Sequence, residues 1–248
     1  MSRGAAPAAP EPPHEAWPDA GAPSWFTALL QLTDSALPTG AFSHSYGLEG
    51  YLHSGAVTEE HGLADWLDAY LDTQLTTTDA LVVRVLYGDL PGVADTPAEM
   101  DALLTAALVP REIRQASVKT GRRLLELSRD GFGGPAVAAY RDQVDEGRCD
   151  GHFCLAFALV GRDLGVPLEV LLRAYAWSTL TSLVQNAVRA VPLGQAAGQR
   201  VLTRCRPRVE ESVRRAMALE PRHFGATAPG LEIAQMRHEH QHARLFMS

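Results

Sequence analysis

The chain has 248 residues, of which 46% are hydrophobic and 21% charged, a composition typical of a globular protein with one large domain. Its formal net charge of −7 argues against nucleic acid or an anionic membrane as the main partner. The single lysine, Lys119, lacks the preceding glycine of a P-loop, which excludes nucleotide binding by that motif. The odd number of cysteines and the lack of an apolar leader predict a cytoplasmic protein. No apolar run reaches about 18 residues, so no transmembrane helix is expected.

Residues 1–24 are rich in proline, alanine and glycine, and we expect them to form a disordered tail. Over 25–248, apolar residues recur with the period of an α-helix. The clearest case is 60–75, where Leu63 and Trp66 share one face and aspartates mark the other. A short helix is predicted to end at 29–32, and the next is predicted to begin at Ser43 or Ser45 and to stop at Gly55. Further helices are predicted over residues 60–75, 77–88, 96–108, 111–129, 135–145, 151–165, 167–191, 193–218 and 231–243.

Two local signals support these boundaries. Thr96 and Glu99, with Pro97 just after the threonine, have the pattern of an N-terminal capping box. Gly165 closes the apolar stretch 151–165, which reads as a buried helix. No alternating run is long enough for a strand. The predicted fold class is therefore all-α, a single-domain bundle of about eight to ten helices over 25–248.

The last residues contain a zinc-protease pattern, H-E-x-x-H, in His238-Glu239-His240-Gln241-His242. On a helix, His238 and His242 would face the same way, with Glu239 as general base. A catalytic zinc needs three protein ligands, however, and no ligand residue follows His242. A solvated terminal helix is favoured. A zinc-dependent hydrolase is the alternative function, and loose metal capture by His238, His240 and His242 is a further option.

The segment 29–52, LLQLTDSALPTGAFSHSYGLEGYL, decides the functional interpretation, because it resembles the N-terminal signature of the UreF family of urease accessory proteins. The segments 151–165, 174–202 and 229–248 resemble later motifs of the same family in the same order. Cys154 departs from the family pattern by standing where a proline is usual. The signature positions expected to be structural are Pro38, Gly40, Phe42, Ser43, Gly47, Leu48, Glu49, Pro192, Gly194 and Gln195.

The resemblance implies an all-helical, dimeric protein without catalytic residues and without a cofactor of its own. Members of the family bind UreD (UreH in some species) and recruit the GTPase UreG. The complex meets apo-urease and couples GTP hydrolysis to nickel delivery. Nickel is thus handled by the complex, and His240 and His242 lie outside the family pattern, so no metal role is carried over to them.

An adaptor of this kind works through surfaces, and we place one at the carboxyl end. Arginine and large apolar side chains are favoured anchors of interfaces. The alternative for Arg237 and Glu239 is a surface ion pair worth less than about 1 kcal/mol. Motif matching implies that Tyr46, Glu232 and Arg244 lie together at the partner surface. The predicted partner-binding residues are Tyr46, Glu232, Arg237, His238, Glu239, Arg244, Leu245 and Phe246.

Overall fold

The computed structural model describes residues 21–226, 228–241 and 244–247, and within them the chain is helical and has no β-strand. The all-α prediction is confirmed. Most of the predicted tail, residues 1–20, lies outside the described residues. The elements are α1 (Phe26–Thr33), η1 (Ala41–Ser43), α2 (Leu48–His53), α3 (Glu60–Tyr70), η2 (Leu71–Asp79), α4 (Ala80–Leu86), α5 (Pro97–Ala107), α6 (Arg111–Leu127), α7 (Pro135–Asp145), α8 (Phe153–Asp163), α9 (Leu168–Ala190), α10 (Gly194–Ala218), η3 (Pro221–His223) and α11 (Pro229–His238).

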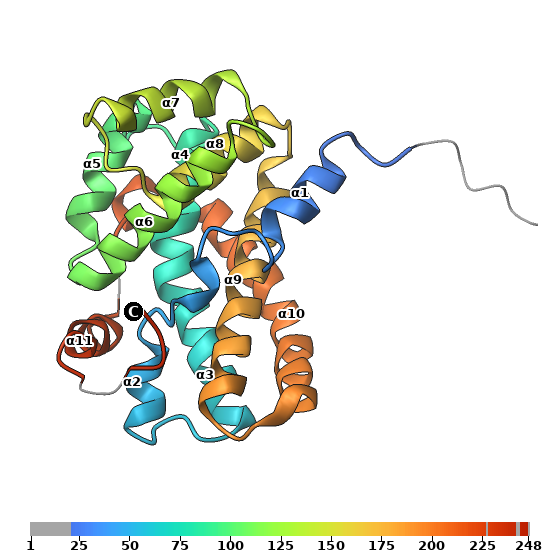
Figure 1. The fold of residues 1–248 in the computed structure, drawn as a ribbon, viewed down its shortest axis with the longest axis vertical. Helices are drawn as coiled ribbons and strands as arrows, with labels where there is room; N and C mark the ends of the chain where they lie inside the picture. The colour runs from blue at the N-terminus through green and yellow to red at the C-terminus, as the bar shows by residue number, and fades with distance from the viewer. Residues whose placement is uncertain (1–20, 227, 242–243, 248) are drawn as a thin grey trace, which may run out of the picture.

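The bundle is organised around α8, which packs against α4, α6, α7 and α9. Its residues 154–161 are all buried, because this helix is apolar around its whole circumference. The long helices α9 and α10 lie side by side, and α10 also packs against α3 (Figure 1). The short helices α2 and α11 meet at the opposite end of the molecule from α7, next to the C-terminus (Figure 1). None of the described helices is long and apolar enough to cross a membrane.

Two helices predicted over 60–75 and 77–88 are in fact one continuous rod. α3 passes into α4 through η2, a π-helical segment of nine residues. A π-helix is wider than an α-helix and is rare at this length. It places polar side chains inside the core, where Thr76 Oγ1 lies 2.7 Å from Ser212 Oγ and Thr77 donates to the carbonyl of Ala226. These contacts satisfy the hydroxyl groups and tie the rod to α10 and to the loop before α11.

At the end of η2, burial raises the pKa of the Asp79 carboxyl to about 7, and a 3.1 Å hydrogen bond from Tyr175 Oη opposes the rise. An unfolded aspartate titrates near pH 4, so between about pH 4 and pH 7 the folded chain keeps a proton that the unfolded chain releases. Stability therefore falls as the pH rises through this window. We expect Asp79→Asn to gain on the order of 2–4 kcal/mol relative to the wild type between pH 4.5 and pH 8.

Urea unfolding at the two pH values measures this difference. Asp130→Asn is the matched control, since Asp130 is exposed in the loop after α6. A pH-independent difference between Asp79→Asn and the wild type would contradict the assignment.

Candidate functional site

The signature segment before α2 folds into a tight corner that directs Glu49 inward. Gly40 and Gly47 adopt left-handed backbone conformations, with φ of +82° and +94°, and the intervening Tyr46 has φ of +53°. A residue other than glycine seldom adopts a positive φ. Tyr46 is held there by its carbonyl, which accepts a 3.0 Å hydrogen bond from Gln235 Nε2 of α11. The corner thus joins the N-terminal signature to the last helix.

Gly47 is required at this corner for two reasons. Its φ lies in the left-handed region, and a Cβ there would come within 2.8 Å of Gln235 Cγ and 3.3 Å of Leu231 Cδ1. We therefore expect Gly47→Ala to cost about 2–3 kcal/mol of unfolding free energy and to push α11 away from α2. Urea unfolding gives the cost. Gly55→Ala separates the two causes, because Gly55 has φ of +73° but a Cβ added there would meet nothing within 4 Å. Equal costs for both variants would contradict the role of the α11 contact.

The centre of the site is a cluster of Glu49, Glu112, His238 and Arg244, here called the tail cluster. Glu49 and His238 are buried, Glu112 is partly buried, and Arg244 lies at the surface. His238 Nε2 lies 2.8 Å from Glu49 Oε2, and its Nδ1 lies 2.6 Å from Glu112 Oε2. Carboxylate oxygens only accept hydrogen bonds, so the ring fills both contacts when both nitrogens carry a proton. Arg244 Nη1 donates to Glu112 Oε1 at 2.7 Å. The cluster therefore places the His238 ring between two carboxylates, one of which also accepts from Arg244.

The last described residues are held across the corner by backbone hydrogen bonds. Glu49 Oε1 accepts from the Leu245 N–H at 2.6 Å, and its Oε2 accepts from the Phe246 N–H at 3.1 Å. The Met247 N–H donates to the Ser43 carbonyl at 3.0 Å. The Arg189 guanidinium lies over the Phe246 ring at 5.4 Å from its centroid. One carboxylate of the signature thus ties α2, α11 and the tail together.

This geometry corrects the predicted terminal helix over 231–243. α11 ends at His238, and Glu239 and His240 form a turn. The helix that the zinc interpretation requires thus stops at its first ligand, and both nitrogens of His238 already face carboxylates. Glu239, the general base of that interpretation, pairs with Arg111 at 2.8 Å instead. His242 lies outside the described residues. The arrangement supports a structural lock and gives no support to a zinc hydrolase.

The predicted partner-binding residues fall into two groups. His238 and Phe246 are 1% and 7% exposed, and they pack against other residues of the same chain. Leu245 is 70% exposed, and Arg237 and Arg244 lie at the surface. Tyr46, Glu232 and Glu239 are intermediate in exposure. The role of this set toward a partner stays a prediction.

The signature positions are likewise divided. Leu48 and Glu49 are buried, Gly47 contacts α11, and the Ser43 carbonyl binds the tail. Phe42 is exposed. Among the other signature residues, Pro38 and Gly40 lie in the turn before η1, and Pro192 lies in the turn between α9 and α10. Gly194 and Gln195 are the first two residues of α10.

Four residues that hold the site were absent from the predicted set: Arg111 and Glu112 at the start of α6, Arg189 near the end of α9, and Gln235 in α11. No sequence motif marks any of them. An acidic residue in the first turn of a helix, like Glu112, is explained by the helix dipole alone. Their role becomes visible only when α6, α9 and α11 are packed together.

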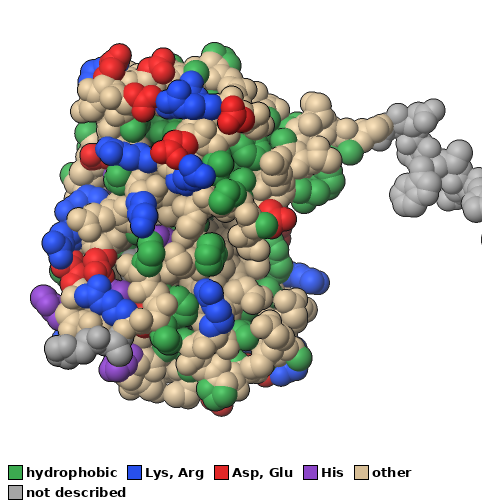
Figure 2. All heavy atoms as spheres, in the orientation of Figure 1, with side chains coloured by type: hydrophobic (Ala, Val, Ile, Leu, Met, Phe, Trp, Pro, Cys, Tyr) green, Lys and Arg blue, Asp and Glu red, His purple; other side chains and the backbone are tan. Residues whose placement is uncertain are grey.

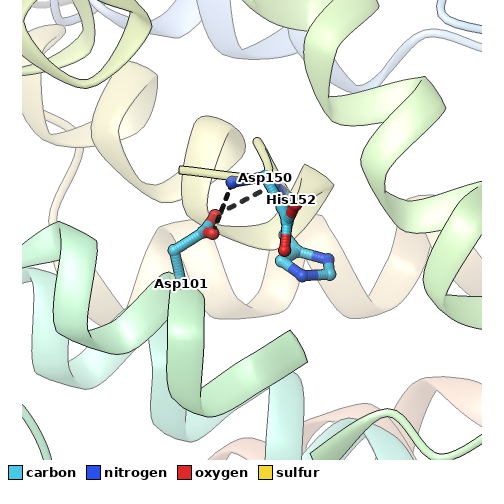
Figure 3. Close-up of side chains that lie close together, drawn as sticks. All are labelled: Asp101, Asp150 and His152. Carbon is cyan, nitrogen blue, oxygen red and sulfur yellow. Dashed lines mark hydrogen bonds between the residues drawn. The ribbon is translucent and has the colours of Figure 1, made fainter. Parts of the chain in front are cut away.

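A second buried cluster, of Asp101, Asp150 and His152, has the composition of a metal site. One ligand atom from each residue lies within 4.8 Å of the others. The Asp101 carboxylate, however, is directed at the backbone of the loop before α8 (Figure 3). It accepts from the N–H groups of Asp150, Gly151 and His152 at 2.7, 3.0 and 3.4 Å.

The remaining polar atoms of this second cluster are also engaged. Tyr140 Oη donates to Asp101 Oδ2. The ring nitrogens of His152 lie 3.0 Å from Ser117 Oγ and 2.9 Å from Thr105 Oγ1. Burial lowers the pKa of His152, and the nearby carboxylates of Asp101 and Asp150 oppose the change. These contacts make the cluster an anchor for the N-terminus of α8.

Comparison with known proteins places these features in a family. The family model UreF matches residues 57–206. A protein of Arthrobacter sp. (strain FB24) named urease accessory protein UreF is 54% identical over 229 residues, which cover 92% of this chain and all of that protein. Proteins of the same name from Paenarthrobacter aurescens and Corynebacterium efficiens are 49% and 43% identical, each over 89% of this chain and 97% and 96% of their own length.

Proposed function

The chain belongs to the UreF family of urease accessory proteins, and from this premise we propose that it is a non-catalytic adaptor of urease maturation. In this proposal it acts in the cytoplasm, binds UreD (UreH in some species) and recruits the GTPase UreG to apo-urease. GTP hydrolysis by UreG would then be coupled to insertion of nickel into the urease active site. The chain itself lacks a P-loop, which fits a division of labour in which the nucleotide belongs to the partner.

One observation carries the proposal: the tail is held in a fixed conformation that leaves apolar side chains facing outward. Leu245 and Met247 are 70% and 45% exposed, while the backbone between them is fixed by Glu49 and Ser43. On α11, Ile233 and Met236 are also exposed. We call Ile233, Met236, Leu245 and Met247 the carboxyl-terminal face. Exposed apolar groups on a preorganised backbone favour association, because little entropy is lost on binding.

Two hollows flank this face and offer space for side chains of a partner. One, of about 290 Å³, lies between α2 and α11 and is lined by Tyr51, Ile233 and Arg237. The other, of about 340 Å³, is lined by Leu52, Arg244 and Leu245. Pockets beside exposed apolar groups are the usual location of the residues that dominate binding energy. We assign the carboxyl-terminal face to UreD.

A second copy of the chain is proposed to cover α1. This helix projects from the body beside α9 (Figure 1). It buries Leu29 and Leu32 but leaves Phe26 and Leu30 42% and 55% exposed. A helix with apolar groups both against the body and toward solvent is suited to a homodimer contact.

Co-purification with UreD and UreG of the same organism tests the adaptor assignment. We expect the full chain to be captured with the partners. A chain ending at Met236 should not be captured, because it lacks both the tail and His238, which holds the tail cluster together. Leu245→Asp should reduce capture at least about tenfold, since a charge replaces an apolar anchor. Leu103→Asp is the control, as Leu103 is 40% exposed on α5. Equal capture of all four proteins would refute the assignment.

A further inference from the structure

A further hollow of the described surface runs along α6, and none of the four residues of the carboxyl-terminal face lines it. Its volume is about 860 Å³, and it is bounded by α6 and by the turn of residues 38–40. The charged residues that line it are Arg114, Lys119, Arg122, Arg123, Glu126 and Asp150. Figure 2 shows Lys and Arg side chains gathered over α6 on this side of the molecule. Four cations thus face two carboxylates in a chain whose net charge is −7.

The arginines of this groove are fixed by backbone carbonyls, and within the described residues only Arg123 among them pairs with a carboxylate. Arg114 Nη1 donates to the Leu108 carbonyl at 2.8 Å. Arg122 Nε donates to the Asp150 carbonyl at 2.7 Å. A carbonyl orients a guanidinium but does not neutralise it, and the remaining N–H groups stay available. Arg123 is the exception, because it pairs with Glu126 at 2.6 Å.

Arginines of α10 show the contrasting arrangement. Arg200 pairs with Glu60, and Arg208 pairs with Asp72 at 2.8 Å. The charges at the α3–α10 seam therefore cancel within the chain. At the α6 groove four cations line the same hollow as two carboxylates, and in an acidic protein such a local excess of positive charge marks a surface for an anionic partner.

The shape of the groove defines the occupant. Its α6 wall runs from Arg114 to Glu126, with lining residues recurring on one face of the helix. At 1.5 Å per residue this wall is about 18 Å long, which matches five to six residues of extended chain. We propose that the α6 groove binds an extended acidic segment of a partner protein, whose carboxylates meet Arg114, Lys119 and Arg122. This surface is additional to the carboxyl-terminal face and does not depend on its assignment to UreD.

Fluorescence polarisation of the full chain with a labelled peptide tests the proposal. The probe carries six consecutive glutamates, and the same peptide with six glutamines is its neutral counterpart. At about 50 mM salt we expect the glutamate peptide to bind, the glutamine peptide not to bind, and the affinity to fall steeply as salt rises. Lys119→Glu with Arg122→Glu should weaken binding at least about tenfold.

The control is a charge change of equal size outside the groove, Arg206→Glu with Arg214→Glu, since both arginines are exposed on α10. It should leave the dissociation constant within about twofold of the wild type. Lys119→Glu alone guards against misfolding, because Lys119 lies at the surface of the groove, and it should still weaken binding. Equal weakening by both double variants, or no binding of the glutamate peptide, would overturn the proposal. Displacement of the peptide by inorganic phosphate, but not by chloride of equal ionic strength, would instead assign the groove to a small anion.

Discussion

Replacing Glu49 by alanine is expected to cost about 3–5 kcal/mol of unfolding free energy and to release the carboxyl-terminal tail. The carboxylate is 4% exposed and accepts hydrogen bonds from His238 Nε2 and from the N–H groups of Leu245 and Phe246. Without it, two backbone donors lose their partner, and the buried ring of His238 faces Glu112 alone. Breaking one side of a buried, hydrogen-bonded ionic contact costs more than the intact contact contributes, because the other side stays desolvated.

Two measurements separate loss of stability from release of the tail. Urea unfolding gives the global cost, and limited trypsin digestion followed by intact mass reports cleavage after Arg237 and Arg244. We expect cleavage at least about tenfold faster in Glu49→Ala under native conditions. Glu239→Ala is the matched control, because its partner Arg111 is 62% exposed and such pairs contribute little. Unchanged cleavage in Glu49→Ala would show that the tail is held by other contacts, and it would remove the basis of the carboxyl-terminal face.

Local sequence signals predicted the helices well, because each signal and the structure that it specifies lie within a few residues. The capping box of Thr96 and Glu99 is present at the start of α5. The apolar stretch 151–165 became the buried helix α8. The merger of 60–75 with 77–88 was missed, because the polar run Gln74–Thr78 looks like a boundary. The hydroxyl groups of Thr76 and Thr77 find partners on α10 and in the loop after η3, which no local pattern shows.

The candidate site was predicted only in its location near the chain end. In the tail cluster, His238 lies 126 positions from Glu112 and 189 positions from Glu49 along the chain, so their roles depend on contacts between helices. From sequence, Glu49 was a signature residue and His238 a partner-binding one. In the packed structure both residues are buried and hold the tail in place, whereas Leu245 is 70% exposed. Long-range pairing of this kind needs the fold first, since nothing in a local pattern specifies it.

Asp101 is expected to be the other residue whose loss is most damaging, because one carboxylate serves four donors. α8 has no side-chain cap of its own at His152. Asp101, which is 2% exposed on α5, supplies the missing acceptor for the N–H groups of Asp150, Gly151 and His152, and it also accepts from Tyr140 Oη. A negative charge at this end of α8 is further stabilised by the helix dipole. We expect Asp101→Ala to cost at least about 3 kcal/mol, since buried donors lose their charged partner.

A double-mutant cycle with Tyr140→Phe measures how much of this cost belongs to one donor. Tyr140→Phe alone should cost about 1–2 kcal/mol, and less than that in the Asp101→Ala background, because its acceptor is already gone. The two costs would instead add if the tyrosine contact were incidental.

The same variants distinguish an anchor from a metal site. An anchor predicts that adding nickel or zinc leaves the melting temperature of the wild type unchanged, whereas a metal site predicts a rise that Asp101→Ala abolishes. Such a rise would reassign Asp101, Asp150 and His152 from holding α8 to holding an ion.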